Sequence, residues 1–440
     1  MNLGMLKLYR YVIILFLASS LSANNGFDFE VVKKGKENNN TMLVVGGIQG
    51  DEPGGFMSAS VLATHYKILD GSVWIVPNLN FYSIIKRNRG PYGDMNRKFA
   101  YLSKKDPEYS TVMRIKKLIT NDKVALVVNL HDGSGYYRKK YIDKNHSPYK
   151  WGQCSVIDQK SIDVKKYSNL AEISSKVVKH VNNHLLAEKD RYHQHNTRTR
   201  EGDKEMAKSL TYYAINHGKA AFGNEATKDL PTHKRVYYHL LALEKYMDIM
   251  GIKYERDFEL TPTGVYNVLN NGISISLYDG KIVLPLHKLR YTLKYMPLER
   301  DNLVKFKANN PLVTIYKKNN SYIIQYGNRK LTRLKAQYKE YDTKTLKVDF
   351  IVDSKEKKVP FGTILEVEKN FLVKDMKGYR VNVIGFSNKS KKETGVLISK
   401  SKIPKRFSID RKGRIYRVEY YRTDAKKEKF AGMVLVKFKS

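Results

Sequence analysis

The chain has 440 residues, too many for one ordinary domain, and its length predicts about two to four domains. Hydrophobic residues make up 42% and aromatic residues 11%, which excludes wholesale disorder. The chain has 80 Lys and Arg residues against 43 Asp and Glu residues, so its net charge is +37 and it attracts anions. Nucleic acids, anionic wall polymers and acidic peptides are equally compatible with this charge. Because Cys154 is the only cysteine, the chain can form no intramolecular disulfide, and we expect a small buried residue there.

The first residues have the layout of a secretory signal peptide. Lys7 and Arg10 provide positive charge, residues 11–21 are apolar, and small residues follow. The apolar run is about half the length that spans a bilayer. Leu21 is a poor residue at a cleavage site, which leaves an uncleaved anchor as the alternative. We expect residues 1–23 to be a signal peptide that directs the protein to the periplasm, and export makes nucleic acid an unexpected partner.

Strand-like and helix-like segments alternate from about residue 41 to residue 252. Apolar runs predict strands at residues 42–48, 73–76, 124–130 and 220–223. Apolar residues at helical spacing predict helices at residues 56–66, 112–119, 167–188 and 233–250. This alternation predicts an α/β domain, a mixed sheet with helices on both faces.

After residue 252 the pattern changes to short strand-like runs separated by Gly, Asn, Asp and Lys. The runs lie at residues 273–278, 281–284, 312–316, 322–326, 346–352, 364–367, 379–384, 395–398 and 433–438. They predict two small all-β modules, the second of them sandwich-like, with a boundary near residues 341–342. The expected domains are therefore residues 24–251, 252–341 and 342–440.

A polar segment at residues 46–55 (GGIQGDEPGG) follows the first buried strand and opens a helix. The carboxyl ends of strands are where α/β sheets build their sites. Gln49 and Glu52 are three residues apart, so their oxygen atoms can converge on one ion. His131 ends the next strong strand, and only the fold could bring it to them. Taken alone, Gln49 and Glu52 are better explained by a turn followed by a helix cap.

Residues 40–250 resemble the funnelin metallocarboxypeptidases and their deacylase relatives. That family binds zinc through His-x-x-Glu after one strand and a distant His after another, and it uses an Asn-Arg pair and a late Glu. The positions that match are Gln49, Glu52 and His131 for zinc, Asn96 and Arg97 for the substrate carboxylate, and Glu225 for the general acid/base. Here a glutamine stands in place of the first zinc histidine.

The glutamine, the predicted export and the two β modules together resemble one subgroup, the peptidoglycan DL-carboxypeptidases that set helical cell shape in curved bacteria. In that subgroup a glutamine replaces the first histidine. The resemblance implies a Zn²⁺ enzyme that cleaves the bond between γ-D-glutamate and meso-diaminopimelate in muramyl tripeptide. It also implies that the partners are muropeptides, with other cell-shape proteins as a further class of partner. An amide oxygen is a poorer zinc ligand than imidazole, so we expect weaker binding or competition from another metal.

Two other functions fit the sequence less well. A zinc deacylase of N-acyl amino acids would need neither export nor β modules. A non-catalytic peptidoglycan-binding shape protein would explain Gln49 but not the retained Glu225.

Other residues near these motifs allow two interpretations each. Arg89 is assigned to substrate binding, although it and Arg87 could equally be solvated. The tyrosines of residues 136–149 and the neighbouring Trp151 could form an aromatic wall or simply pack. No role is predicted for the nearby His193 and His195.

Overall fold

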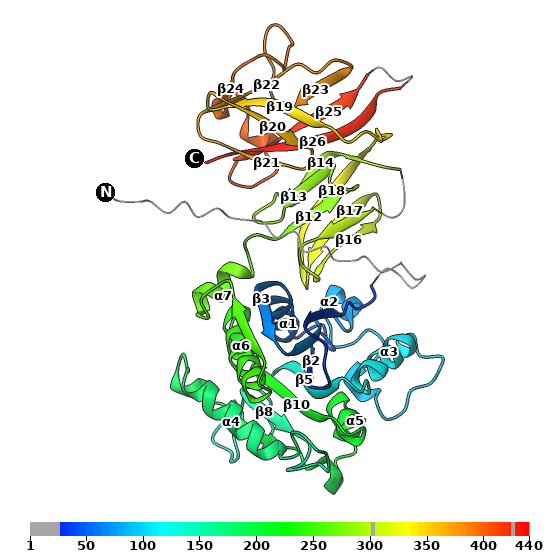
Figure 1. Ribbon diagram of the computed structural model, residues 1–440, viewed down its shortest axis with the longest axis vertical. Helices are drawn as coiled ribbons and strands as arrows, with labels where there is room; N and C mark the ends of the chain where they lie inside the picture. The colour runs from blue at the N-terminus through cyan, green and yellow to red at the C-terminus, as the bar shows by residue number, and fades with distance from the viewer. Residues whose placement is uncertain (1–26, 301–303, 424–426, 440) are drawn as a thin grey trace, which may run out of the picture.

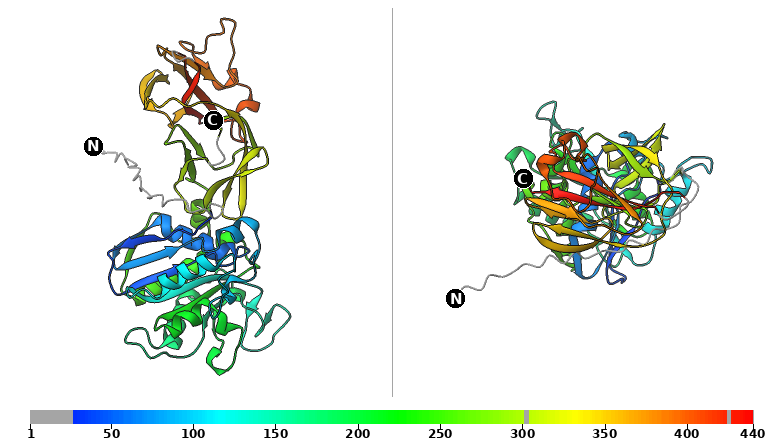
Figure 2. Two further views of the ribbon diagram at one scale, coloured as in Figure 1. Left: turned by 90° about the vertical axis from the view of Figure 1, so that its right-hand side faces the viewer. Right: turned by 90° about the horizontal axis from the view of Figure 1, so that it is seen from above.

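The computed structural model describes residues 27–300, 304–423 and 427–439. The predicted signal peptide, residues 1–23, lies outside these ranges. No helix within them is long and apolar enough to cross a membrane. The molecule is elongated, with the α/β part at one end and the β-sheets stacked on it (Figure 1). Figure 2 shows the same order from two further sides.

A seven-stranded mixed sheet forms the centre of the α/β part, in the order β1-β4-β2-β5-β10-β8-β9. β4, β2, β5 and β10 are parallel, whereas β1 and β8 run antiparallel to β4 and β10. The central strands β2 and β4 are buried along their whole length, as expected for a parallel sheet covered on both faces. The strands are Val32–Gly35 (β1), Thr41–Val45 (β2), Ser72–Val76 (β4), Val124–Gly133 (β5), Cys154–Ile157 (β8), His193–Asn196 (β9) and Ala220–Thr227 (β10).

Helices cover both faces of this sheet, which confirms the predicted fold class. α1, α4 and α6 pack together on one face, and α3 and α5 lie on the other (Figure 1). The helices are Pro53–His65 (α1), Phe81–Lys86 (α2), Tyr109–Ile119 (α3), Leu170–Asn182 (α4), Leu210–Asn216 (α5), Thr232–Ile249 (α6) and Pro262–Val268 (α7). Cys154 is fully buried in β8, as predicted.

Several element bounds differ from the sequence prediction. The helix predicted at residues 167–188 is the shorter α4, because the Asn169 side chain caps its start by accepting from the backbone N–H of Glu172. The first predicted strand ends at Val45, where the chain turns through Gly47 with a positive φ of 74°.

The two strands that carry site residues are longer than predicted. β5 continues through Gly133 and β10 through Thr227, because backbone pairing carries on beyond the apolar residues. His131 and Glu225 therefore lie inside paired strands rather than after them. The strand β8 and the edge strand β9 beside it were not predicted, nor was β3 (Tyr66–Asp70), which begins where the first helix was expected to end.

Beyond α7 the described residues form β-sheets, as predicted, although short 3-10 helices join some of them and α7 itself lies within the region expected to be all-β. The sheet orders are β13-β12-β15, β14-β18-β17-β16, β20-β19-β22-β24 and β21-β26-β25-β23. Two smaller strand pairs lie before α7 in the chain: β11 (Lys253–Arg256) with β3, and β6 (Tyr136–Tyr137) with β7 (His146–Ser147). The remaining strands are Ser274–Leu277 (β12), Ile282–Pro285 (β13), Thr292–Leu298 (β14), Phe306–Ala308 (β15), Val313–Lys318 (β16), Ser321–Tyr326 (β17), Arg329–Tyr338 (β18), Lys347–Val352 (β19), Lys355–Pro360 (β20), Ile364–Val367 (β21), Asn370–Val373 (β22), Tyr379–Val383 (β23), Ile398–Ser399 (β24), Ile415–Arg422 (β25) and Lys429–Phe438 (β26).

The two groups of β-sheets differ in how they are stabilised. The last two sheets contribute to a separate apolar core, to which Phe350 and Val434 belong. The first two share one continuous core with the α/β part, to which the last sheet also contributes Ile415, Met433 and Leu435. At that junction Ser60 of α1 donates to the Asn310 side chain at 3.0 Å. The first β group is therefore packed directly on α1, while the predicted boundary residues stay predictions.

Candidate active site

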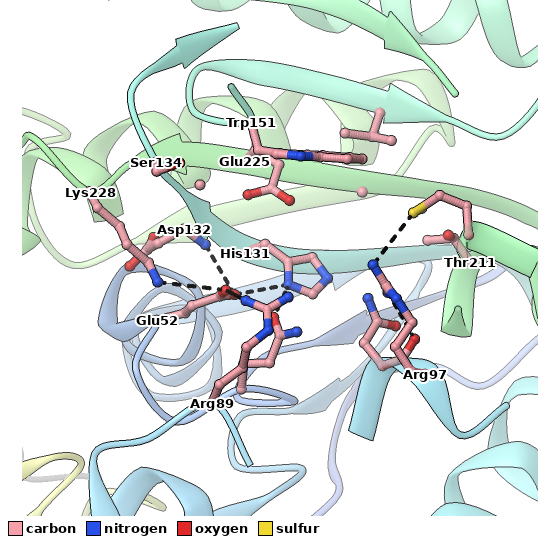
Figure 3. A pocket seen from close by; sticks show the side chains of 16 residues that line it. Glu52, Arg89, Arg97, His131, Asp132, Ser134, Trp151, Thr211, Glu225 and Lys228 are labelled. Atoms are coloured by element: carbon pink, nitrogen blue, oxygen red, sulfur yellow. Dashed lines mark hydrogen bonds and ion pairs between the residues drawn. The ribbon is translucent and has the colours of Figure 1, made fainter. Parts of the chain in front are cut away.

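All seven predicted site residues line one cavity of about 220 Å³ (Figure 3). They come from the turn after β2, the segment before α3, β5 and β10. The residues are Gln49, Glu52, Arg89, Asn96, Arg97, His131 and Glu225. The sheet therefore brings together residues that are far apart in the chain, at the carboxyl ends of its parallel strands.

A close approach between the start of α1 and the end of β5 forms the centre of the cavity. The backbone N–H of Gly54 donates to Asp132 Oδ2 at 2.7 Å. A Cβ on Gly54 would lie 2.1 Å from Asp132 Oδ1, so only glycine permits this contact. Glu52, immediately before α1, is thereby held beside β5, and its Oε2 accepts from the backbone N–H of Asp132 at 3.2 Å.

Three donor atoms for a metal converge at this point. His131 Nδ1 lies 3.0 Å from Gln49 Oε1 and 2.9 Å from Glu52 Oε2. The amide nitrogen of Gln49 donates to Asp94 Oδ1 at 2.7 Å, which turns the amide oxygen toward His131. An outer contact of this kind orients a metal ligand. One nitrogen and two oxygens fit a catalytic zinc site with an open position.

The amide of Gln49 is needed to complete such a set of three. Nowhere in the described ranges do three or more His, Cys, Asp or Glu side chains form a group that could hold a metal ion. Here two residues of these types, Glu52 and His131, meet, and the third donor is the Gln49 oxygen. The residues present therefore fit a metal, with one ligand weaker than the imidazole usual in zinc sites.

Glu225 faces the same space from the neighbouring strand. It is the direct partner of His131 in the β10–β5 ladder, so both side chains lie on one face of the sheet. The side chain is buried, and its Oε2 atom has no hydrogen-bond partner. Burial raises the pKa of Glu225 to about 8, and the negative charges of Glu52 and Asp132 act in the same direction. A carboxyl group with a pKa near neutrality is suited to proton transfer.

The raised pKa of Glu225 makes the stability of the metal-free protein depend on pH. The folded state disfavours the carboxylate, so the free energy of unfolding falls as the pH rises from the ordinary value of 4.5 to about 8. Glutamine cannot ionise. We therefore expect Glu225→Gln to raise the Tm of the metal-free protein more at pH 8 than at pH 4.5. Thermal unfolding with a chelator present measures this, and equal Tm differences at both pH values would contradict it.

The pKa values of the neighbouring groups reflect the same charges. Burial disfavours the charged form of His131, but the hydrogen bond and charge of Glu52 outweigh it and raise the pKa of His131. Burial also opposes ionisation of Asp132, yet His239, Arg235 and the Gly54 amide together lower its pKa. The cavity thus holds charges whose balance a bound cation would change.

The basic residues of the cavity differ in their freedom to bind a ligand. Arg89 is bound to Asp94 at 2.9 Å and to Glu52 at 3.3 Å. Arg97 has a looser pair with the exposed Glu205 at 3.5 Å, and it reaches the cavity wall opposite Glu225 (Figure 3). Arg97 is therefore better placed to receive a substrate carboxylate. The Asn96 side-chain oxygen accepts from the backbone of α5, so that side chain also fixes the wall.

The structure decides which of the aromatic residues at positions 136–151 line the cavity and which do not. Trp151 lines the cavity, whereas Tyr141 and Tyr149 are exposed. Tyr137 stacks on His195 with ring centroids 4.0 Å apart, and Trp151 contacts the same ring at 4.8 Å. The aromatic wall thus consists of Trp151 supported by the edge strand β9.

Sequence reasoning missed Lys228 as a lining residue. Its Nζ lies 2.7 Å from Asp51 Oδ2 and 4.0 Å from Glu52 Oε1. Its position just past the strand that carries Glu225 was the available signal. Arg87, by contrast, is not among the lining residues. It ends α2 in the left-handed conformation.

Comparisons with known proteins give matches to family models and to solved structures. A model described as the catalytic part of a carboxypeptidase controlling helical cell shape matches residues 6–270, and one described as the C-terminal domain of metallo-carboxypeptidase matches residues 341–439. No curated protein sequence matches the chain. The apo structure of the cell shape determinant protein Csd4 from Helicobacter pylori is 40% identical, with a TM-score of 0.84, and the match covers 93% of this chain and all (100%) of that one.

Two further structures of the Helicobacter pylori protein match equally well. The tripeptide-bound structure has 40% identity, a TM-score of 0.84 and coverage of 93% and 100%. The mDAP-bound form, described as a D,L-carboxypeptidase, has 40% identity, a TM-score of 0.84 and coverage of 92% and 100%.

Proposed function

Because the chain belongs to the family of carboxypeptidases that control helical cell shape, we propose that it is a periplasmic, zinc-dependent DL-carboxypeptidase. Its substrate is peptidoglycan muramyl tripeptide, and the bond cleaved joins γ-D-glutamate to meso-diaminopimelate. The observation that carries the proposal is the convergence of Gln49, Glu52 and His131 beside the buried carboxyl group of Glu225. The tripeptide and mDAP named for the Helicobacter pylori structures support this choice of substrate.

In this mechanism Gln49, Glu52 and His131 hold the zinc ion, which when bound supplies a Lewis acid for the scissile carbonyl. Glu225 Oε2 takes a proton from the attacking water and delivers it to the amine of the departing diaminopimelate. The unpartnered state of that oxygen leaves it available for this transfer. Asp94 keeps the Gln49 oxygen, rather than its nitrogen, directed at the ligand cluster.

Arg97 anchors the substrate by its terminal carboxylate. The guanidinium group can form two parallel hydrogen bonds with a carboxylate, and the net charge of +37 draws such acidic peptides toward the protein. Trp151 supplies an apolar part of the wall of the same cavity.

Incubation of the zinc-loaded protein with purified muramyl tripeptide, followed by mass analysis, tests the proposed function. Release of diaminopimelate and a dipeptide stem is expected, with no release after treatment with a chelator. The alternative of a non-catalytic wall-binding protein is favoured by the weak ligand Gln49. Tripeptide binding without any release of diaminopimelate, with zinc bound, would establish that alternative instead.

The unusual ligand gives a prediction about metal affinity. Gln49→His is expected to keep or raise the zinc affinity, because imidazole is the better donor and its second nitrogen can still donate to Asp94. Gln49→Ala is expected to lower it. Competition with a chromogenic chelator measures both affinities. If neither substitution changes the affinity, Gln49 is not a ligand.

Substrate capture gives a second prediction. Arg97→Lys replaces a fork of donors by a single point charge, so one charge-assisted hydrogen bond of about 1.5–3 kcal/mol is lost. The value of kcat/KM on muramyl tripeptide should fall roughly ten- to a hundredfold. Arg87→Lys, outside the cavity lining, is the matched control and should have ordinary kinetics. Unchanged kinetics for Arg97→Lys would remove Arg97 from the substrate site.

A further inference from the structure

A second hollow lies in the C-terminal β-sheets, beyond β24 and separate from the residues of the candidate active site. It has a volume of about 680 Å³. Three lysines, Lys400, Lys405 and Lys412, line it, and the buried Tyr416 lies against it. The Tyr416 hydroxyl donates to the backbone oxygen of Gly413 at 3.0 Å, so the ring is fixed in place.

The loop that forms this hollow is held in shape by the neighbouring β-sheets. Arg290 donates to the backbone oxygens of Ser408 at 2.7 Å and Lys405 at 2.6 Å. The stem of Lys405 lies over Gly413, where a Cβ would approach Lys405 Cγ to 2.6 Å. The hollow is therefore formed before any ligand arrives, which lowers the entropic cost of binding.

The charge around the hollow is almost entirely positive. Residues 400–414 contain seven Lys and Arg residues and one acidic residue, Asp410. Both carboxylate oxygens of Asp410 accept backbone N–H groups of its own turn. No ion pair in the described parts of the chain involves Lys405 or Lys412. The positive charge of the two lysines is thus available to an anion.

An exposed aromatic ring contacts Arg411, the residue before Lys412 in the same loop. Tyr291 is 75% exposed, and the guanidinium group of Arg411 lies 5.3 Å from its ring centroid. The backbone N–H of Arg411 donates to the backbone oxygen of Lys288, which ties the loop to the segment that carries Tyr291. A cation and an exposed ring side by side suit a ligand that has both carboxylates and an extended backbone or sugar surface.

Size and charge together indicate the class of ligand. The lysines that line the hollow come from one short loop, so it suits the carboxylates of a short peptide. We propose that the hollow binds the carboxylate-bearing stem peptides of peptidoglycan as a second, non-catalytic site. This inference rests on the proposed function for the identity of the polymer. Two sites on one chain raise the effective concentration of further stems at the active site.

Co-sedimentation with isolated, insoluble peptidoglycan tests the inference. The site variant carries Lys405→Glu and Lys412→Glu. The matched control carries Lys355→Glu and Lys357→Glu on β20, at the opposite edge of the sheet that ends in β24, so the charge change is the same. The site variant should bind peptidoglycan about tenfold or more weakly, because like charges then face the ligand. The control should bind normally, and both should cleave soluble muramyl tripeptide at the wild-type rate.

Four other outcomes of the binding measurements overturn the inference. Equal losses in both variants would mean that the net charge alone binds the wall. No loss in the site variant, or equal binding to glycan strands stripped of stem peptides, would exclude stem peptides as the ligand. Binding of duplex DNA that depends on the hollow, without binding of peptidoglycan, would assign it to nucleic acid. Failure of the wild-type protein to cleave soluble tripeptide would refute the proposed function, whereas co-sedimentation would still decide the second site.

Discussion

Glu225→Gln is expected to lower kcat on muramyl tripeptide by about 10²–10⁴-fold while zinc binding is retained. Glutamine has nearly the same shape and can occupy the same place beside His131 in the β10–β5 ladder. It cannot accept a proton from water and pass it to the leaving amine. Because Glu225 is not one of the three converging donors, its replacement removes proton transfer and leaves the metal ligands in place.

Three measurements on Glu225→Gln separate the possible causes of a loss. Zinc content by elemental analysis should equal that of the wild type, circular dichroism should be unchanged, and tripeptide should still bind in calorimetry. Glu201→Gln, at an exposed position, is the control for loss of one carboxylate and should turn over normally. Near-normal turnover by Glu225→Gln would mean that another residue is the base.

The sequence indicated the site more fully than it indicated the fold around it. Gln49 and His131 could be selected because polar residues directly after apolar strands are the signal of a site in an α/β sheet, whereas Glu225 was assigned through the family resemblance. The direct pairing of His131 with Glu225 could not be foreseen. Strand ends are recognised by where apolar residues stop, whereas backbone pairing continues through polar ones.

Residues that act on the site from other segments had no sequence signal. Asp94 orients the Gln49 amide across 45 positions, and nothing in the local sequence reveals that contact. The support of Trp151 by His195 depends on β9, whose residues lack the apolar alternation that predicts a strand. The strands β14, β18 and β25 were missed because Lys and Arg interrupt their apolar residues.

His131→Ala is expected to abolish zinc binding and with it all turnover. Imidazole is the one nitrogen donor of the three, and the remaining carboxylate and amide oxygens of Glu52 and Gln49 form a poor site for zinc. The zinc affinity should fall by more than the roughly 10- to 100-fold typical of losing an outer contact. Elemental analysis after dialysis and chelator competition measure this.

A matched histidine control separates metal loss from damage to the fold. His131 also contacts the buried Glu52, so its removal takes away one partner of that carboxylate, which keeps the Asp132 amide and Arg89, and lowers the Tm. His146→Ala removes a histidine paired with Asp143 outside the cavity lining, and it should keep full zinc. Full zinc stoichiometry in a folded His131→Ala protein would overturn the ligand assignment.

The proposed enzyme predicts that His131→Ala loses both zinc and turnover, whereas Glu225→Gln loses turnover alone. That pair of results would assign metal binding to a residue of β5 and proton transfer to a residue of β10. A non-catalytic wall-binding protein predicts a different pair of results. There, His131→Ala would lose the metal, but neither substitution would change a turnover that the wild type already lacks. The two variants, measured on the same tripeptide, therefore decide between a hydrolase with a weak ligand and a binding protein that has kept the ligands without the chemistry.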